Sequence, residues 1–309
     1  FIVAAYQEHT RTLDIGSGAL EKRLTGALAP AFSEENRFWL AQGKDIQYLE
    51  VDSSGAKPVF SIRLPNQLEG KENAILDVGS YLVVGSTEGL FEYQKPSQSF
   101  HKVPIALDYG HSHIQVEGSR NYNVYSLARW GDKIFVGAPR VFQLTAEPEQ
   151  LSSPTALPES FSANPKGKLE VVEEEQLLWK VNYGAPAALD LQNGEVHELD
   201  TIFPFNALEK SYPFYFDGVD LAWDSKRQWL WAVGRGHGLF AFQVDRNKKR
   251  INMVWSLRDL QGTNLFDAIA VDTDGRIWVG SDEGLILYNP ETDDSGILGY
   301  RESEVFPLF

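Results

Sequence analysis

The sequence predicts an all-β fold, a seven-bladed β-propeller of four-stranded antiparallel blades. Three observations support this prediction: short alternating strands recur along the whole chain, glycine-containing turns recur at fixed places within the copies, and the copies are spaced as propeller blades are. The clearest copy, residues 266–290, combines an alternating apolar run, an Asp-Gly turn at 274–275, a short strand around Trp278 and a Gly-Leu turn before a third strand.

Each copy can be anchored on the apolar residue at the centre of its second strand. Alternation places one face of every strand between blades, and a large anchor fills that layer. We therefore expect the anchors and most of the repeat glycines to be structural. The anchors are Val3, Trp39, Val83, Phe135, Trp179, Trp231 and Trp278.

The two ends of the sequence indicate how the ring closes. Residue 1 falls inside a second-strand pattern, so the first blade lacks its innermost strand, and an alternating segment, 303–309, remains after the last full blade. We expect this segment to complete the first blade, which would remove the exposed edges of the ring. Because the repeats cover the whole length, residues 1–309 are expected to form one domain.

Composition excludes several classes of function. The net charge of −15 disfavours nucleic acid and anionic membrane surfaces, which require clustered Lys and Arg. No segment is apolar over the length that a membrane span needs, so no membrane insertion is expected. The chain has no cysteine, which excludes disulfides, thiol catalysis and thiolate metal sites and fits a periplasmic or extracellular protein.

Three insertions interrupt the repeats, and propeller ligands usually bind such loops. Residues 106–121 carry two histidines, residues 145–167 are rich in Pro, Ser and Glu and are expected to be exposed, and residues 201–218 hold many aromatics. The last insertion predicts a surface on which sugar rings stack, because flat rings cover the apolar faces of sugars; packing of these aromatics onto the ring is the alternative. Its predicted ligand-binding residues are Tyr212, Phe214, Tyr215 and Asp217.

Carboxylates at the starts of inner strands form a second group of candidates. Asp267 precedes one apolar run, and Asp217 and Asp220 have a similar place one blade earlier. Such groups can accept hydrogen bonds from ligand hydroxyls or hold a hard cation such as calcium. Arg235 and His237 add polar side chains to a hairpin turn and are assigned to the ligand site, with a solvated turn as the alternative. No catalytic residue and no cofactor is assigned.

The segment 271–290 resembles the two-component regulator propeller repeat, which runs approximately Asp-x-x-Gly-x-Ile-Trp-hydrophobic-Gly-Thr-x-x-Gly-Leu-x-x-Tyr-Asp. The copy at 81–93 is similar in its second half. Members of that family are typically periplasmic sensor regions of bacterial kinases, regulators or cyclases, and known systems often respond to glycan fragments. The resemblance implies a seven-bladed sensor module whose signalling domains lie outside this chain. Many of those sensors carry two propellers and a following β-sandwich, whereas this sequence shows one propeller.

A second resemblance points to an enzyme. Residues 266–278 look like the last blade of gluconolactonase-type six-bladed propellers, in which an Asp at the position of Asp267 binds the catalytic divalent metal. This implies a metal-dependent, lactonase-like hydrolase that uses Asp267 with Asp217 or Asp220. The N-terminal Glu-Gly-Pro-type motif of that family and its Asn before an equivalent strand are not found here, and seven repeats differ from six blades.

The function predicted from the sequence is non-catalytic recognition of a small molecule or oligosaccharide by a bacterial sensor module. Two alternatives stay open. The chain could be a metal-dependent hydrolase, or it could be a protein-interaction scaffold that presents an apolar patch on one rim to a protein partner.

Overall fold

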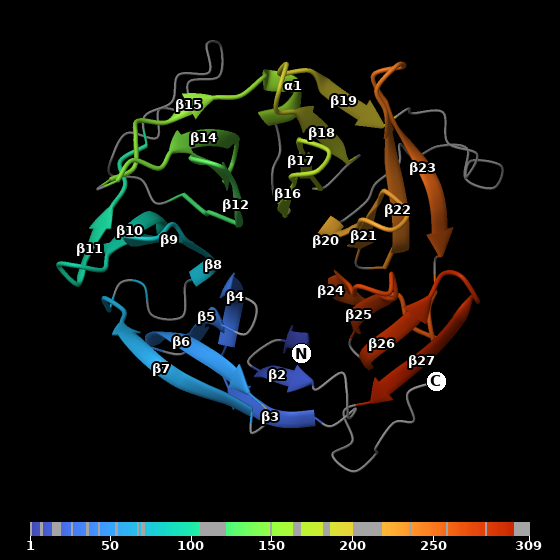
Figure 1. Ribbon diagram of the computed structural model, residues 1–309, viewed down its shortest axis with the longest axis horizontal. Helices are drawn as coiled ribbons and strands as arrows, with labels where there is room; N and C mark the ends of the chain where they lie inside the picture. Colours follow the sequence, from blue (N-terminus) through green and yellow to red (C-terminus); the bar gives the residue numbers. More distant parts are fainter. Residues whose placement is uncertain are drawn as a thin grey trace. The chain divides into compact units, whose positions relative to one another are not determined.

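The computed structural model is built almost entirely of β-strands, as the sequence predicts (Figure 1). The described residues up to Ala156 form one compact unit, and those from Leu157 onward form a second. The structure describes residues 2–6, 9–13, 20–25, 27–34, 37–42, 44–52, 55–66, 68, 72–105, 122–148, 150–162, 168–181, 186–199, 218–234, 236–257, 259–281 and 283–299.

The described residues of the first unit form antiparallel sheets that follow one another along the chain. The first sheet has three strands, and the next three have four strands each, paired in chain order. The segment 303–309, predicted to complete the first sheet, lies outside the described residues. The strands are β1 (Ile2–Tyr6), β2 (His9–Leu13), β3 (Leu20–Thr25), β4 (Ala27–Glu34), β5 (Arg37–Gln42), β6 (Asp45–Asp52), β7 (Gly55–Arg63), β8 (Glu72–Asp77), β9 (Tyr81–Ser86), β10 (Gly89–Gln94), β11 (Ser99–Lys102), β12 (Ser126–Trp130), β13 (Lys133–Gly137), β14 (Val141–Thr145) and β15 (Thr155–Ala156).

The described part of the second unit consists of three four-stranded antiparallel meanders and the short helix α1 (Glu159–Ser162). The first two meanders are joined into one sheet, because their last strands, β19 and β23, pair in parallel. The first strands of neighbouring meanders, β16, β20 and β24, are in contact. The strands are β16 (Leu169–Val172), β17 (Leu177–Lys180), β18 (Ala187–Asp190), β19 (Val196–Leu199), β20 (Gly218–Asp224), β21 (Trp229–Gly234), β22 (Gly238–Asp245), β23 (Arg250–Leu257), β24 (Phe266–Val271), β25 (Ile277–Ser281), β26 (Gly284–Asn289) and β27 (Asp294–Gly299).

The large residues at the centres of the second strands are buried, as predicted. Each of the six anchors from the second copy onward lies on the second strand of a four-stranded meander, and none is more than 4% exposed. In the second unit the ring of Trp255 lies 5.0 Å from that of Trp231 and 5.3 Å from that of Tyr288, so an aromatic cluster joins the last two meanders. The six anchors are Trp39, Val83, Phe135, Trp179, Trp231 and Trp278.

Three of the buried tryptophans donate the indole N–H to an aspartate at the end of a first strand. Burial of an indole nitrogen requires such an acceptor, because water cannot reach it. The sequence therefore has to supply both the ring and the carboxylate. The nitrogen lies 2.7, 3.2 and 3.0 Å from the carboxylate oxygen in the pairs Trp39–Asp77, Trp231–Asp224 and Trp278–Asp272.

Asp272 also organises the turn between β24 and β25, as the Asp-Gly pattern predicts. Its Oδ1 accepts hydrogen bonds from the backbone N–H of Asp274 at 3.0 Å and of Arg276 at 2.9 Å. Gly275 in this turn has φ of +77°, a conformation that other residues adopt only with strain. Although burial acts to raise it, hydrogen bonds from Trp278 and Arg276 hold the pKa of Asp272 below its usual value.

The described part of the insertion at 145–167 is mostly exposed, as its composition predicts, and is attached to the sheets at a few points. In the first unit the hydroxyl of Tyr81 donates to the carbonyl oxygens of Glu147 and Gln150, each at 3.2 Å. In the second unit Phe161 of α1 is completely buried. Backbone carbonyls that accept from a tyrosine hydroxyl and one buried ring are the points at which the otherwise exposed segment is held.

We expect the substitution Asp272→Ala to lower the free energy of unfolding by about 2–3 kcal/mol, because it leaves the buried indole N–H of Trp278 and two turn amides without their acceptor. Urea unfolding followed by tryptophan fluorescence measures this loss. The control is Asp274→Ala in the same turn, whose side chain is 71% exposed and which should change stability by less than about 0.5 kcal/mol. Equal effects of the two substitutions would contradict the structural role of Asp272.

Candidate ligand-binding site

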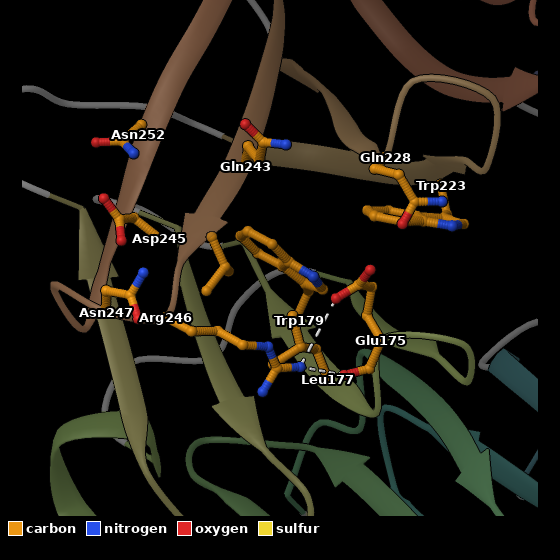
Figure 2. A pocket seen from close by; sticks show the side chains of 11 residues that line it. Glu175, Leu177, Trp179, Trp223, Gln228, Gln243, Asp245, Arg246, Asn247 and Asn252 are labelled. Carbon is orange, nitrogen blue, oxygen red and sulfur yellow. Dashed lines mark hydrogen bonds and ion pairs between the residues drawn. The ribbon is translucent and has the colours of Figure 1, made fainter.

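A cleft with a volume of about 480 Å³ opens between the first two meanders of the second unit (Figure 2). This volume falls within the range of roughly 300–1,000 Å³ that is usual for small-molecule sites. Its lining combines two tryptophans with four side-chain amides and three charged groups. The lining residues are Glu175, Leu177, Trp179, Trp223, Gln228, Gln243, Val244, Asp245, Arg246, Asn247 and Asn252.

Strand alternation explains which side chains reach the cleft. Leu177 and Trp179 are two residues apart on β17 and therefore share one face, where both are 1% exposed and form the floor. Trp223 on β20 forms part of the opposite side, and its indole nitrogen donates to the carboxylate of Glu174. Figure 2 shows the ring of Trp179 in the middle of the labelled side chains.

Arg246, in the turn between β22 and β23, is held by acidic groups of the neighbouring meander. Its guanidinium donates to the carboxylate of Asp190 and to the carbonyl oxygen of Glu175, and it lies 3.7 Å from the Glu175 carboxylate; dashed lines mark its contacts with Glu175 in Figure 2. Although burial acts to raise it, hydrogen bonds from the backbone N–H of Gln192 and Asn193 and the charge of Arg246 lower the pKa of Asp190. The two meanders are thus clamped together beside the cleft.

The rest of the rim is polar but largely uncharged. Gln228, Gln243 and Asn247 are exposed, and Asn252 on β23 is half-buried. Each amide offers donors and an acceptor, the combination that ligand hydroxyls require. The backbone N–H and the ammonium group of Lys248 lower the pKa of Asp245, which is therefore a carboxylate acceptor at neutral pH.

The floor contains a polar group without a hydrogen-bond partner. The indole nitrogen of Trp179 is buried, and no acceptor for it exists among the residues that the structure describes. The three other second-strand tryptophans, at Trp39, Trp231 and Trp278, each donate to an aspartate. This donor is enclosed in the protein interior and has no accessible surface in the cleft.

His197 lies in the same row of the sheet. Trp179, Ala188 and His197 are direct cross-strand neighbours on β17, β18 and β19, so their side chains share a face. His197 is 1% exposed, and within the described ranges neither ring nitrogen has a hydrogen-bond partner. Burial lowers the pKa of His197 below its ordinary value of 6.5, although the carboxylate of Glu195 acts in the opposite direction. The folded protein therefore holds a neutral imidazole.

The residues predicted from the sequence to bind ligand do not line this cleft where they are described. Tyr212, Phe214, Tyr215, Asp217 and Arg235 lie outside the described residues. His237 lies in the turn between β21 and β22, where its backbone N–H donates to the carbonyl of Gly234 at 3.1 Å. The ligand-binding role of these residues stays a prediction.

Asp220 and Asp267 lie on β20 and β24, two strands that contact each other. Asp220 faces Lys168, whose ammonium group lies 2.5 Å from its Oδ1, and its Oδ2 accepts from the backbone N–H of Ile269 at 3.0 Å. Glu170 on β16 is close to this pair, and burial raises its pKa. The ammonium group of Lys168 thus lies beside Asp220, at the place where the sequence suggested a bound metal cation. In the described part of the chain no three acidic or histidine side chains come together as a metal site.

The cleft could not be recognised from single motifs, but one sequence signal pointed to it. Trp179 was interpreted as a structural anchor, which its burial confirms. The signal is the residue at the end of the preceding strand, which is Asp224 for Trp231 and Asp272 for Trp278 but Val172 for Trp179. Trp179 differs in this respect from Trp231 and Trp278, whereas Trp39 takes its acceptor, Asp77, from the first strand of the next meander.

Comparison with known proteins shows the fold and no closer relationship. No family model matches the sequence, and no curated protein matches it. Among the described residues no helix has the length and hydropathy needed to cross a membrane.

Several solved structures share the propeller-like, all-β architecture. One is the extracellular domain of the hybrid two component system BT4673 from B. thetaiotaomicron, with a TM-score of 0.61 and 14% identity; the match covers 98% of this chain but 36% of that one, so this chain spans about a third of its length. Virginiamycin B lyase from Staphylococcus aureus matches with a TM-score of 0.61, 10% identity and coverage of 89% and 85%. Apo AztD from Citrobacter koseri matches with a TM-score of 0.62, 10% identity and coverage of 96% and 92%.

We expect acid to destabilise the protein through His197. Its pKa is lower in the folded than in the unfolded chain, so the unfolded chain binds the additional proton. The stability contribution is complete above pH 6.5 and is lost as the pH falls from that value to the lower pKa of the folded state. Thermal unfolding at pH 8, 7, 6 and 5 should show the loss, at most about 1.4 kcal/mol per pH unit.

The substitution His197→Leu should flatten this profile, because a leucine of similar size needs no partner. His101→Ala, at an exposed histidine, should keep the steep profile of the unchanged protein. A profile that stays equally steep in His197→Leu would show that another group is responsible.

Proposed function

We propose that this chain is the ligand-recognising β-propeller of a bacterial periplasmic or extracellular sensor, and that carbohydrate binds in the cleft between β16–β19 and β20–β23. In this proposal residues 1–309 form one domain, a closed seven-bladed ring in which residues 303–309 complete the first blade. Recognition needs no catalytic residue, and domains outside this chain carry the signal.

The observation that carries the proposal is the chemistry of the cleft lining. Trp223 supplies aromatic surface, and four side-chain amides supply paired donors and acceptors around the cleft. Sugars present apolar faces and a dense ring of hydroxyls, so they match this combination better than a purely apolar ligand or an ion does. The volume of about 480 Å³ suits one or two sugar rings.

The fold supports the sensor part of the proposal only in combination with the site. The BT4673 structure is the extracellular domain of a hybrid two component system, whereas other proteins of similar architecture include a lyase. Because one fold serves several functions, the cleft and not the fold decides between them. Asp220 and Asp267, on the neighbouring first strands, remain a second candidate surface for the same ligand.

Isothermal titration calorimetry with a panel of neutral oligosaccharides should detect binding to the unchanged protein. Gln243→Ala and Asn252→Ala should each weaken it about 5- to 10-fold, because each removes one amide from the rim. Gln192→Ala, at an exposed amide in the turn between β18 and β19 and outside the cleft, should leave affinity unchanged.

The same samples distinguish the alternatives. No heat with any glycan, together with capture of a protein partner, would replace the sensor proposal by the interaction scaffold. Turnover of a lactone that a chelator abolishes and that Asp267→Asn removes would replace it by the hydrolase. Thermal melts of every variant verify that the fold is intact.

A further inference from the structure

The seam, the parallel pairing of β19 with β23, joins the first two meanders of the second unit. Among the described residues it consists of two residue pairs, Glu198 with Arg250 and Leu199 with Ile251. By contrast, seven residue pairs join β22 to β23 inside the second meander. Because the seam has so little backbone pairing, it can open at a lower free energy than the meanders on either side of it.

Salt bridges reinforce the seam. Arg246, in the turn between β22 and β23, donates to the carboxylate of Asp190. The ammonium group of Lys249, in the same turn, contacts the carboxylate of Glu195. Asp190 ends β18 and Glu195 lies just before β19, so both carboxylates belong to the other meander. The closed seam therefore depends on two cations from one meander and two carboxylates from the other.

His197 is buried beside these four charges. It lies on β19 with 1% of its surface exposed, and neither ring nitrogen has a hydrogen-bond partner among the described residues. The charges that act on its ring are those of Glu195, Arg246, Asp190 and Lys249. These charges are already paired with one another, so the closed seam accommodates a neutral imidazole.

Protonation of His197 upsets this balance. Three cations then share two carboxylates, and water does not reach the buried ring to solvate the additional charge. The imidazolium has to take Asp190 from Arg246 or Glu195 from Lys249. Opening of the seam removes the competition, because it brings the ring into contact with water while the strands of each meander stay paired.

We propose that the seam is an acid-operated switch, in which protonation of His197 breaks the salt bridges of Arg246 and Lys249 and separates β19 from β23. The cleft lies between the same two meanders, so its walls come apart when the seam opens. Neutral pH keeps the binding site closed and rigid, and acid loosens it. The switch is a property of the free protein and does not depend on the class of ligand.

Hydrogen–deuterium exchange of the free protein, followed by mass spectrometry between pH 7.5 and pH 5, measures the opening once the rates are corrected for the intrinsic pH dependence of amide exchange. Above pH 6.5 the imidazole is neutral in both forms, so protection should not change. As the pH falls from 6.5 to the lower pKa of the closed form, peptides that contain β19 and residues 250–252 should lose protection by up to about tenfold per pH unit, because opening binds one proton. Peptides from β21 should keep theirs.

Two substitutions test the role of the proton. His197→Leu removes the titrating group, so the protection of the seam should no longer depend on pH. Lys249→Gln keeps the imidazole but frees the carboxylate of Glu195 to pair with it, so the loss of protection in acid should become smaller. Glutamine suits this position, because Lys249 has φ of +55° and Gln176 and Gln228 adopt similar values. His101→Ala, at an exposed histidine, is the control and should show the same loss as the unchanged protein.

The outcomes separate this inference from the proposed function. If the seam keeps its protection down to pH 5, or if His197→Leu loses it as the unchanged protein does, the inference is wrong. If β21 loses protection together with the seam, acid unfolds the domain as a whole, and the inference is again wrong. None of these measurements uses a ligand, so each leaves the carbohydrate function in place; that function fails only if the glycan panel shows no binding.

Discussion

The hydrogen bond between a buried tryptophan and an aspartate at a strand end is the interaction on which the packing of Trp39, Trp231 and Trp278 depends. The tryptophan fills the layer between meanders, and its N–H then needs an acceptor where water cannot enter. Asp272 provides that acceptor for Trp278 and also orders the turn through two backbone amides. One carboxylate thus serves both the local turn and the packing of the ring. A sequence that lacks this carboxylate must provide another acceptor for the indole N–H.

Trp179 shows the consequence of breaking this coupling. Its ring keeps the structural role, because it is as buried as Trp231, but Val172 supplies no carboxylate. Real proteins depart from local consistency mostly at functional sites. The structure shows two further features at this place: a cleft above the ring, and a neutral His197 in the same row of the sheet. On this shared face, two buried polar side chains have no hydrogen-bond partner among the residues that the structure describes.

The sequence predicted the strands and turns well because those features are local. Alternation placed Trp39 and Trp278 on second strands, and the Asp-Gly pair placed the turn at Gly275. It could not predict the cleft, because Trp179 and Arg246 come from different meanders and meet only through packing. It favoured the aromatic insertion at 201–218, where unusual composition is visible, over a tryptophan that looked structural. That insertion lies largely outside the described residues, so its role rests on the sequence.

Arg246 explains how the cleft can be selective in a chain with a net charge of −15. The guanidinium is engaged by Asp190 and by Glu175, so it does not serve as an attractor for anions but fixes the two walls relative to each other. A site whose walls are fixed before binding loses less conformational freedom when the ligand enters. Affinity then depends mainly on hydrogen bonds and ring contacts, and the directions of these contacts distinguish one neutral ligand from another. It depends only weakly on charge, which does not distinguish between neutral ligands.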